Sequence, residues 1–137
     1  MTFYADTSLL VSALSPDANT ARARDWLKTG PGLIISAWAV AEFGAIVRRQ
    51  ARVGRIARAG VDAAEAGLQT LVAGGAFRPV LADDLVEAGR LVRRLEPLRA
   101  PDALHLAVAL RLRLDVATFD VGLATAARAA GLGAAPL

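Results

Sequence analysis

Residues 2–14, TFYADTSLLVSAL, contain the pattern that decides the fold. The short apolar segment Thr2–Ala5 predicts a buried strand that ends at Asp6, and residues 8–14 show the apolar spacing of a helix. A carboxylate at the end of a buried strand is costly without a partner, and neither neighbour of Asp6 is a Lys or Arg. We therefore expect this strand to deliver an acidic group to a site.

The same alternation of short strands and helices continues along the chain. Ser36, Asp83 and Asp120 stand where N-cap residues are expected. The pattern predicts strands at 2–5, 33–35, 77–81 and 115–119, a short edge strand after 132, and helices at 8–14, 19–28, 37–49, 56–72, 84–95, 102–112 and 121–130. Such alternation predicts an α/β sandwich around a mostly parallel sheet of four to five short strands.

Length and composition limit the classes of protein that remain. The 137 residues suit a single domain, 1–137, and carry a net charge of +3. The absence of Cys excludes thiolate zinc sites, Fe–S clusters and disulfide scaffolds, and the single histidine, His105, excludes a His-pair metal motif. The apolar stretch Leu33–Ala41 is far shorter than the ~20 residues of a membrane helix, and Asp6 interrupts any secretory leader, so we expect a soluble, cytoplasmic protein without membrane contact.

Four acidic residues are expected at one edge of the sheet. Asp6 ends the first strand, Glu42 lies in the helix after the second strand, Asp102 opens the sixth helix and Asp120 follows the fourth strand. Ligands of parallel sheets gather beyond the carboxyl ends of the strands. Four carboxylates that converge without a cation would repel one another, and all-oxygen ligation favours Mg²⁺ or Mn²⁺.

Each acid also has a purely structural interpretation. Asp102 and Asp120 both stand where a helix N-cap belongs, and Glu42 would simply mark the solvent side of its helix. The other acids, Asp84 among them, are expected on loops, caps or polar helix faces. His105, one helical turn from Asp102, is expected to pack or to form a structural hydrogen bond.

Several other α/β phosphate-handling classes fail on particular residues. A haloacid-dehalogenase-like phosphatase needs a second Asp two residues after the first, where this chain has Ser8. A receiver domain needs a lysine late in the chain, whereas the only lysine is Lys28. Rossmann and P-loop proteins need a Gly-rich turn after the first strand, and residues 6–10 are DTSLL.

Four segments together resemble the PIN-domain ribonucleases, and within them the VapC toxins of bacterial toxin–antitoxin pairs. They are YADTSLL at 4–10, AEF at 41–43, PDALHLA at 101–107, and TFD at 118–120 followed by Leu123-Ala124. The resemblance covers essentially the whole chain and implies a PIN-like α/β/α sandwich. It also implies that Asp6, Glu42, Asp102 and Asp120 are the catalytic, metal-binding acids of a Mg²⁺-dependent endoribonuclease, with Mn²⁺ as a possible substitute. Ser8 and Thr118 match positions that support such a site by hydrogen bonding.

The resemblance further implies an RNA substrate (tRNA, rRNA or mRNA), a VapB-like antitoxin and a homodimer, with an apolar interface between about Trp38 and Val72. From the residues themselves, the run that includes Arg48, Arg49 and Arg52 is a candidate RNA-contact surface, or else a solvated helix surface in an Arg-rich protein. The alternative function is a non-catalytic PIN-fold module that binds RNA or protein.

Overall fold

The structure is a computed structural model that describes residues 1–137, except for the side chain of Ala76. Its sheet holds β1 (Thr2–Ala5), β2 (Gly32–Ser36), β3 (Ala76–Arg78) and β4 (Val116–Ala117) in the order β3-β2-β1-β4. All three pairings are parallel. Ala134 adds an isolated parallel bridge to Val116, close to the edge strand expected after residue 132. The predicted α/β architecture around a parallel sheet is therefore confirmed.

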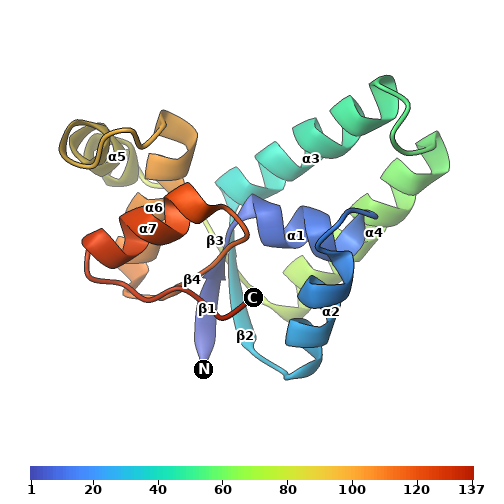
Figure 1. Ribbon diagram of the computed structural model, residues 1–137, viewed down its shortest axis with the longest axis horizontal. Coiled ribbons are helices and arrows are strands. Elements are labelled where there is room, and N and C mark those ends of the chain that lie inside the picture. Colours follow the sequence, from blue (N-terminus) through green and yellow to red (C-terminus); the bar gives the residue numbers. More distant parts are fainter.

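Seven helices cover the two faces of this sheet (Figure 1). They are α1 (Thr7–Leu14), α2 (Thr20–Lys28), α3 (Ala37–Arg52), α4 (Arg58–Gly74), α5 (Ala82–Arg94), α6 (Ala100–Leu112) and α7 (Val121–Ala129). Helices α1 to α4 lie on one face, and α5 to α7 lie on the other (Figure 1). Helices α3 and α4 pack side by side as an arm that extends away from the sheet.

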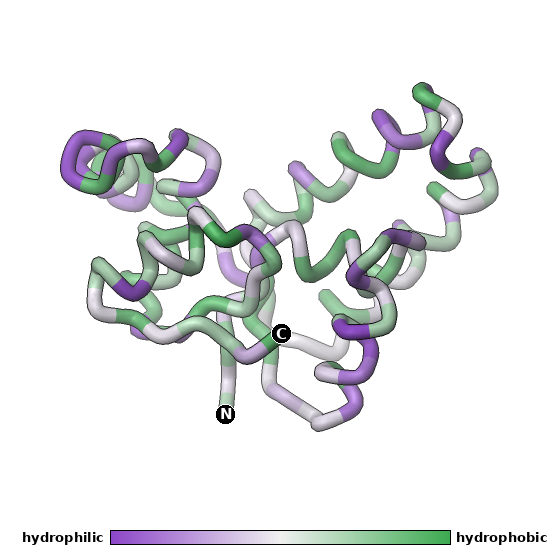
Figure 2. The backbone as a smooth tube through the Cα atoms, viewed as in Figure 1, coloured by the Kyte–Doolittle hydropathy of each residue, from purple (hydrophilic) through white to green (hydrophobic). Residues whose placement is uncertain are grey.

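The central strand β1 divides the interior into two cores because its side chains alternate between the faces. Phe3 and Ala5 join the core under α1 to α4, whereas Tyr4 joins the core under α5 to α7. In β2, Ile35 and Ile34 divide between the two cores in the same way. Figure 2 shows hydrophilic stretches on the outer helices α2 and α5. Within the described part of the chain, no helix is long and apolar enough to cross a membrane.

The strand expected at 77–81 spans only Ala76–Arg78, and the helix expected from 102 begins at Ala100. Two further predicted boundaries were wrong, and polar side chains explain both. Asp83 does not cap α5: the helix begins at Ala82, and Asp84 accepts the hydrogen bond from the Leu81 backbone at 2.8 Å. The strand expected at 115–119 contains only Val116 and Ala117. The Thr118 hydroxyl accepts from the Asp120 backbone at 2.9 Å, and this bond turns the chain into α7.

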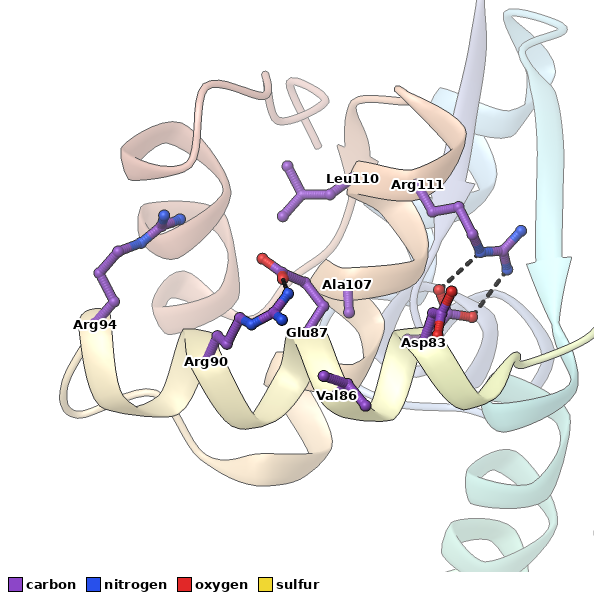
Figure 3. Close-up of a pocket in the computed structure, with 9 residues that line it drawn as sticks. Asp83, Val86, Glu87, Arg90, Arg94, Ala107, Leu110 and Arg111 are labelled. Atoms are coloured by element: carbon purple, nitrogen blue, oxygen red, sulfur yellow. Dashed lines mark hydrogen bonds and ion pairs between the residues drawn. The ribbon is translucent and has the colours of Figure 1, made fainter.

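Asp84 was expected at the surface, but its side chain is only 2% exposed. Arg111 reaches from α6 to the start of α5 (Figure 3) and donates to both carboxylate oxygens of Asp84, from Nε at 2.7 Å and from Nη2 at 3.0 Å. The same Nη2 donates to the Pro79 carbonyl at 3.0 Å. This forked contact joins α5 to α6, and α6 carries Asp102.

We expect Arg111→Met to lower the free energy of unfolding by about 3 kcal/mol, because it leaves the Asp84 carboxylate buried without its counter-charge. This value is at the low end for a broken buried pair, since the Arg111 side chain is 28% exposed. The matched control is Arg90→Met, which removes an exposed pair with Glu87 and should cost less than about 1 kcal/mol. Urea unfolding of both variants measures the difference, and equal losses would contradict this account.

Candidate functional site

The candidate site lies at the carboxyl ends of β1 and β4. The strand order reverses at this point, because β2 and β3 extend from one side of β1 and β4 lies on the other. Asp6 directly follows β1, and Asp120 lies in the short connection from β4 to α7. Such a switch point is where open parallel sheets bind ligands. The backbone of Asp6 donates to the Ala117 carbonyl at 3.2 Å, which ties the two strand ends together.

Asp6 is a buried carboxylate, with 4% of the residue exposed. Its Oδ1 accepts from the Ser8 hydroxyl at 2.8 Å and from the Leu9 backbone at 3.2 Å, so it also caps α1. Ser8 in turn accepts from the Phe119 backbone at 2.8 Å and lies 3.2 Å from the Thr118 hydroxyl. Burial raises the pKa of Asp6, and these hydrogen bonds only partly oppose that effect.

Asp120 and Asp102 are close enough to repel each other. Asp120 is the N-cap of α7 and accepts from the Leu123 backbone at 2.8 Å, as its position predicts. The N-cap interpretation of Asp102 is wrong, because Arg99 occupies that position and Asp102 lies in the first turn of α6. The Asp102 side chain is 17% exposed and pairs with Arg99 Nε at 3.2 Å. Burial raises the pKa of Asp102, and the Asp120 carboxylate raises it further.

Glu42 faces the interior side of α3 and is held by two groups. Its Oε2 accepts from the Thr7 hydroxyl at 2.7 Å and lies 2.5 Å from His105 Nε2. Its side chain is 22% exposed, so the solvent-side interpretation does not describe it. Burial would raise the pKa of Glu42, but the hydrogen bonds from His105 and Thr7 outweigh it and lower the pKa.

The acids share one edge of the sheet without forming a compact ligand cluster. Among the described residues, no three His, Cys, Asp or Glu side chains stand together as a metal-binding group. The donor chemistry nevertheless fits a divalent cation, because Asp102 and Asp120 each use one oxygen for protein contacts and no described donor reaches Asp102 Oδ1 or Asp120 Oδ2. A cation would also relieve the repulsion that raises the pKa of Asp102.

A groove of about 350 Å³ adjoins two of these acids. Asp102, Asp120 and Arg99 line one part of it, and apolar residues such as Leu98 and Val121 line the rest. A larger hollow of about 670 Å³ lies between α5 and α6 beside Arg111 (Figure 3). The larger hollow contains neither Asp102 nor Asp120, so the groove is the one that belongs to the candidate site.

The three candidate RNA-contact arginines lie on the arm, beyond Glu42 along α3. At 1.5 Å per residue, Arg48 lies about 9 Å and Arg52 about 15 Å from Glu42 along the helix axis. All three are exposed. Arg48 is paired with Glu65 of α4, and Arg48 and Arg52 line a small pocket with Asp62.

Sequence reasoning missed Thr7 and the contact between His105 and Glu42. The signal was present, because His105 is the one polar side chain in a run of buried residues, 103–109. A buried imidazole requires hydrogen-bond partners, but the pattern of α6 does not show that the partner comes from α3.

We expect Asp6→Asn to raise the free energy of unfolding at pH 7 in metal-free buffer, by about 1–2 kcal/mol, because a neutral amide replaces a buried charge and still caps α1. The pKa of Asp6 is raised in the folded state, so the ionised group destabilises the fold above that pKa. The advantage of the Asn variant should therefore shrink as the pH falls toward the ordinary value of 3.8.

Thermal and urea unfolding between pH 4 and pH 8 would measure this difference. Asp120→Asn is the matched control, since Asp120 caps α7 in the same way but is less buried, and it should bring no gain. A loss of stability for Asp6→Asn at pH 7 would show that the ionised carboxylate is favourable where it lies.

Comparisons with known proteins agree with this architecture. The family model described as "PIN domain" matches residues 3–129. The toxin VapC20 of Mycobacterium tuberculosis, described as cleaving the sarcin–ricin loop, has 21% identity and a TM-score of 0.73, covering 95% of each chain. FitAcB of Neisseria gonorrhoeae has 22% identity and a TM-score of 0.70, covering 98% of this chain and 96% of that chain.

VapBC2 of Rickettsia felis, solved with a DNA fragment from its promoter, has 17% identity and a TM-score of 0.67, covering 98% of each chain. At these identities the structures show a shared fold. A sequence comparison with curated proteins found no significant match. The family model spans both halves of the sheet and all four acids, so the predicted resemblance to PIN-domain proteins is confirmed, and the fold is shared with a VapC toxin. The chain belongs to the PIN domain family.

Proposed function

We propose that residues 1–137 act as a single PIN domain that hydrolyses RNA phosphodiester bonds with a divalent metal, as the cytoplasmic toxin of a toxin–antitoxin pair. The observation that carries this proposal is the placement of Asp6, Asp102 and Asp120 around the switch point of the sheet, with Glu42 nearby on α3, in a chain of the PIN domain family. The toxin role is supported by fold neighbours that are themselves described as toxins or toxin–antitoxin complexes.

In this proposal Asp6, Glu42, Asp102 and Asp120 hold Mg²⁺, or Mn²⁺ in its place. The bound metal would polarise the phosphate, lower the pKa of a bound water and stabilise the leaving oxygen. The chain's own contribution is rigidity. Asp6 is fixed by Ser8 and Leu9, and Asp120 is fixed by the start of α7, so neither carboxylate needs to reorganise when charge develops.

Besides its place among the acids that hold the metal, Glu42 is the candidate for orienting the attacking water. Its carboxylate is ionised at neutral pH and accepts hydrogen bonds, so it suits a water beside the metal. Arg99 lies beside Asp102 at the rim of the groove, where its cationic side chain suits an RNA phosphate. Arg49 and Arg52 extend the cationic surface along the arm.

Protein partners are also part of the proposal: a VapB-like antitoxin and a second copy of the chain. Exposed apolar side chains support a protein interface. Within the range 38–72, Val53 is the one large apolar side chain that is strongly exposed among the described residues, whereas Leu81, Leu85 and Val86 are exposed together at α5. The apolar surface is therefore more pronounced at α5 than in the range that the sequence indicated.

Two observations favour the alternative of a non-catalytic binding module. Arg99 pairs with Asp102 in the structure, and the described acids do not form a three-ligand group. A module that only binds RNA would need the arginines and not the acids. Substitutions of the acids therefore separate the two functions.

We expect purified protein to produce discrete new 5′ ends in total bacterial RNA in the presence of Mg²⁺, and none with EDTA. Asp6→Asn, Asp102→Asn and Asp120→Asn should each lower the cleavage rate by at least about 100-fold, because each removes an anionic metal ligand. Sequencing of 5′ ends measures both the rate and the target.

The matched control is Asp25→Asn, an exposed aspartate of α2 that pairs with Lys28 and should cleave at the unaltered rate. Unchanged RNA binding together with cleavage that is absent from every form of the protein, including the unsubstituted chain, would favour the binding module. Cleavage that survives Asp6→Asn would contradict the assignment of the acids.

We expect Arg49→Gln and Arg52→Gln each to reduce the slope of log binding affinity against log salt concentration by about 0.7–0.9, as the loss of one phosphate contact does. Arg48→Gln should change the slope less, because Arg48 is already paired with Glu65. Binding of uncleaved RNA to the Asp6→Asn protein at several salt concentrations measures the slope. If all three variants keep the slope of the protein without these substitutions, the arginine run is a solvated surface.

A further inference from the structure

A continuous chain of buried hydrogen bonds crosses the molecule and ends on Glu42. Ser36 Oγ lies 2.8 Å from the Tyr4 hydroxyl, which lies 2.7 Å from His105 Nδ1, and His105 Nε2 lies 2.5 Å from Glu42 Oε2. Ser36 and Tyr4 are 0% exposed and His105 is 2% exposed. This series of hydrogen bonds links the end of β2, the centre of β1 and the middle of α6 to the proposed active-site edge.

Counting donors fixes the direction of the bond to Glu42. The Ala39 backbone donates to Ser36 Oγ as the cap of α3, and the second lone pair of that oxygen leaves Ser36 able to donate to Tyr4 or to accept from it. The Tyr4 hydroxyl donates to His105 Nδ1 when that nitrogen carries no proton and accepts from it when it does. The Glu42 carboxylate only accepts, so the donor in its contact with the imidazole is Nε2. Whichever way the bond to Tyr4 runs, Nε2 carries a proton that it donates to Glu42.

We propose that His105 is a positioning residue for Glu42: it holds Oε2 in place through its Nε2–H, while Tyr4 and Ser36 hold the imidazole ring in the orientation that allows this contact. This inference rests on the proposed nuclease function for its effect on rate. The contacts involve only one of the two carboxylate oxygens: Thr7 and His105 both bind Oε2, and no described donor reaches Oε1. Oε1 is therefore the atom left for water, metal or substrate.

The position of His105 on α6 means that its bond to Glu42 connects two helices that each carry a candidate acid. Asp102 lies one helical turn earlier on the same helix, and Glu42 lies on α3 across the sheet edge. The bond from His105 to Glu42 therefore fixes α3 relative to the helix that carries another acid. Partners that orient a ligand or base in this way typically change activity or metal affinity by about 10–100-fold when they are removed.

Two isosteric substitutions of His105 separate positioning from packing. In Gln the amide lies at the distance of Nε2 from the backbone, so His105→Gln retains a donor toward Glu42. In Asn the amide lies at the distance of Nδ1, so His105→Asn retains the contact with Tyr4 and loses the one with Glu42. We expect kcat to fall about 10–100-fold for His105→Asn with little change in KM, and distinctly less for His105→Gln.

Thermal unfolding of both variants provides the structural control, because each replaces the same buried ring by a smaller amide. Equal losses of kcat in the two variants, in proportion to their losses of stability, would assign His105 to packing and overturn the inference. If neither variant folds, Tyr4→Phe takes their place: it keeps the ring whose centroid lies 5.7 Å from that of the imidazole and removes only the hydroxyl that bonds to Nδ1. An unchanged kcat in Tyr4→Phe would then overturn the inference.

A second readout needs no activity. His105 is the only histidine, so the ¹⁵N spectrum of the metal-free, tag-free protein holds a single imidazole. We expect the chemical shift of a protonated Nε2 at pH 7, and an Nε2 without a proton would overturn the inference. If instead Asp6→Asn retains full cleavage, the proposed nuclease site has failed, and the protonation of Nε2 still stands as a result on its own.

Discussion

The carboxylate of Asp6, buried where β1 ends, is the constraint on which the rest of the site depends. It cannot be left without partners, and its neighbours are arranged accordingly: the Ser8 hydroxyl and the start of α1 donate to it, and Ser8 in turn accepts from the backbone after β4. One charge thus determines how two parallel strands end and where two helices begin. The position that makes Asp6 costly for the fold is also the position where a sheet of this topology binds a ligand.

Much of this arrangement could be predicted from the sequence, because it depends on local signals. The apolar strand before Asp6 and the caps at Ser36 and Asp120 are each set by residues within a few positions of one another. What could not be predicted depends on contacts between distant elements. In the sequence Asp84 belongs to a polar helical pattern, and only the fold shows that Arg111 of α6 pairs with it. Likewise, the sequence around His105 does not show that its partner, Glu42, comes from α3.

The acids differ in their environments although they share residue type and edge. Burial raises the pKa of Asp6, repulsion by Asp120 adds to burial at Asp102, and hydrogen bonds lower the pKa of Glu42. Divergent environments for neighbouring carboxylates are typical of sites in which one group holds charge and another moves protons. The acids therefore differ in pKa because of the groups that surround each of them, although all lie at the same edge of the sheet.

Helix α6 is buried over most of its length, with residues 103–109 enclosed by the sheet and by its neighbours α5 and α7. It carries both Asp102 and His105, so a largely buried helix holds two residues of the candidate site. In a library of random substitutions, α6 should tolerate only residues of matching volume, whereas the arm and the outer surface of α5 should accept wide variation. Descendants of this chain can therefore diversify what they recognise through the arm and α5 while the acids at the sheet edge stay where they are.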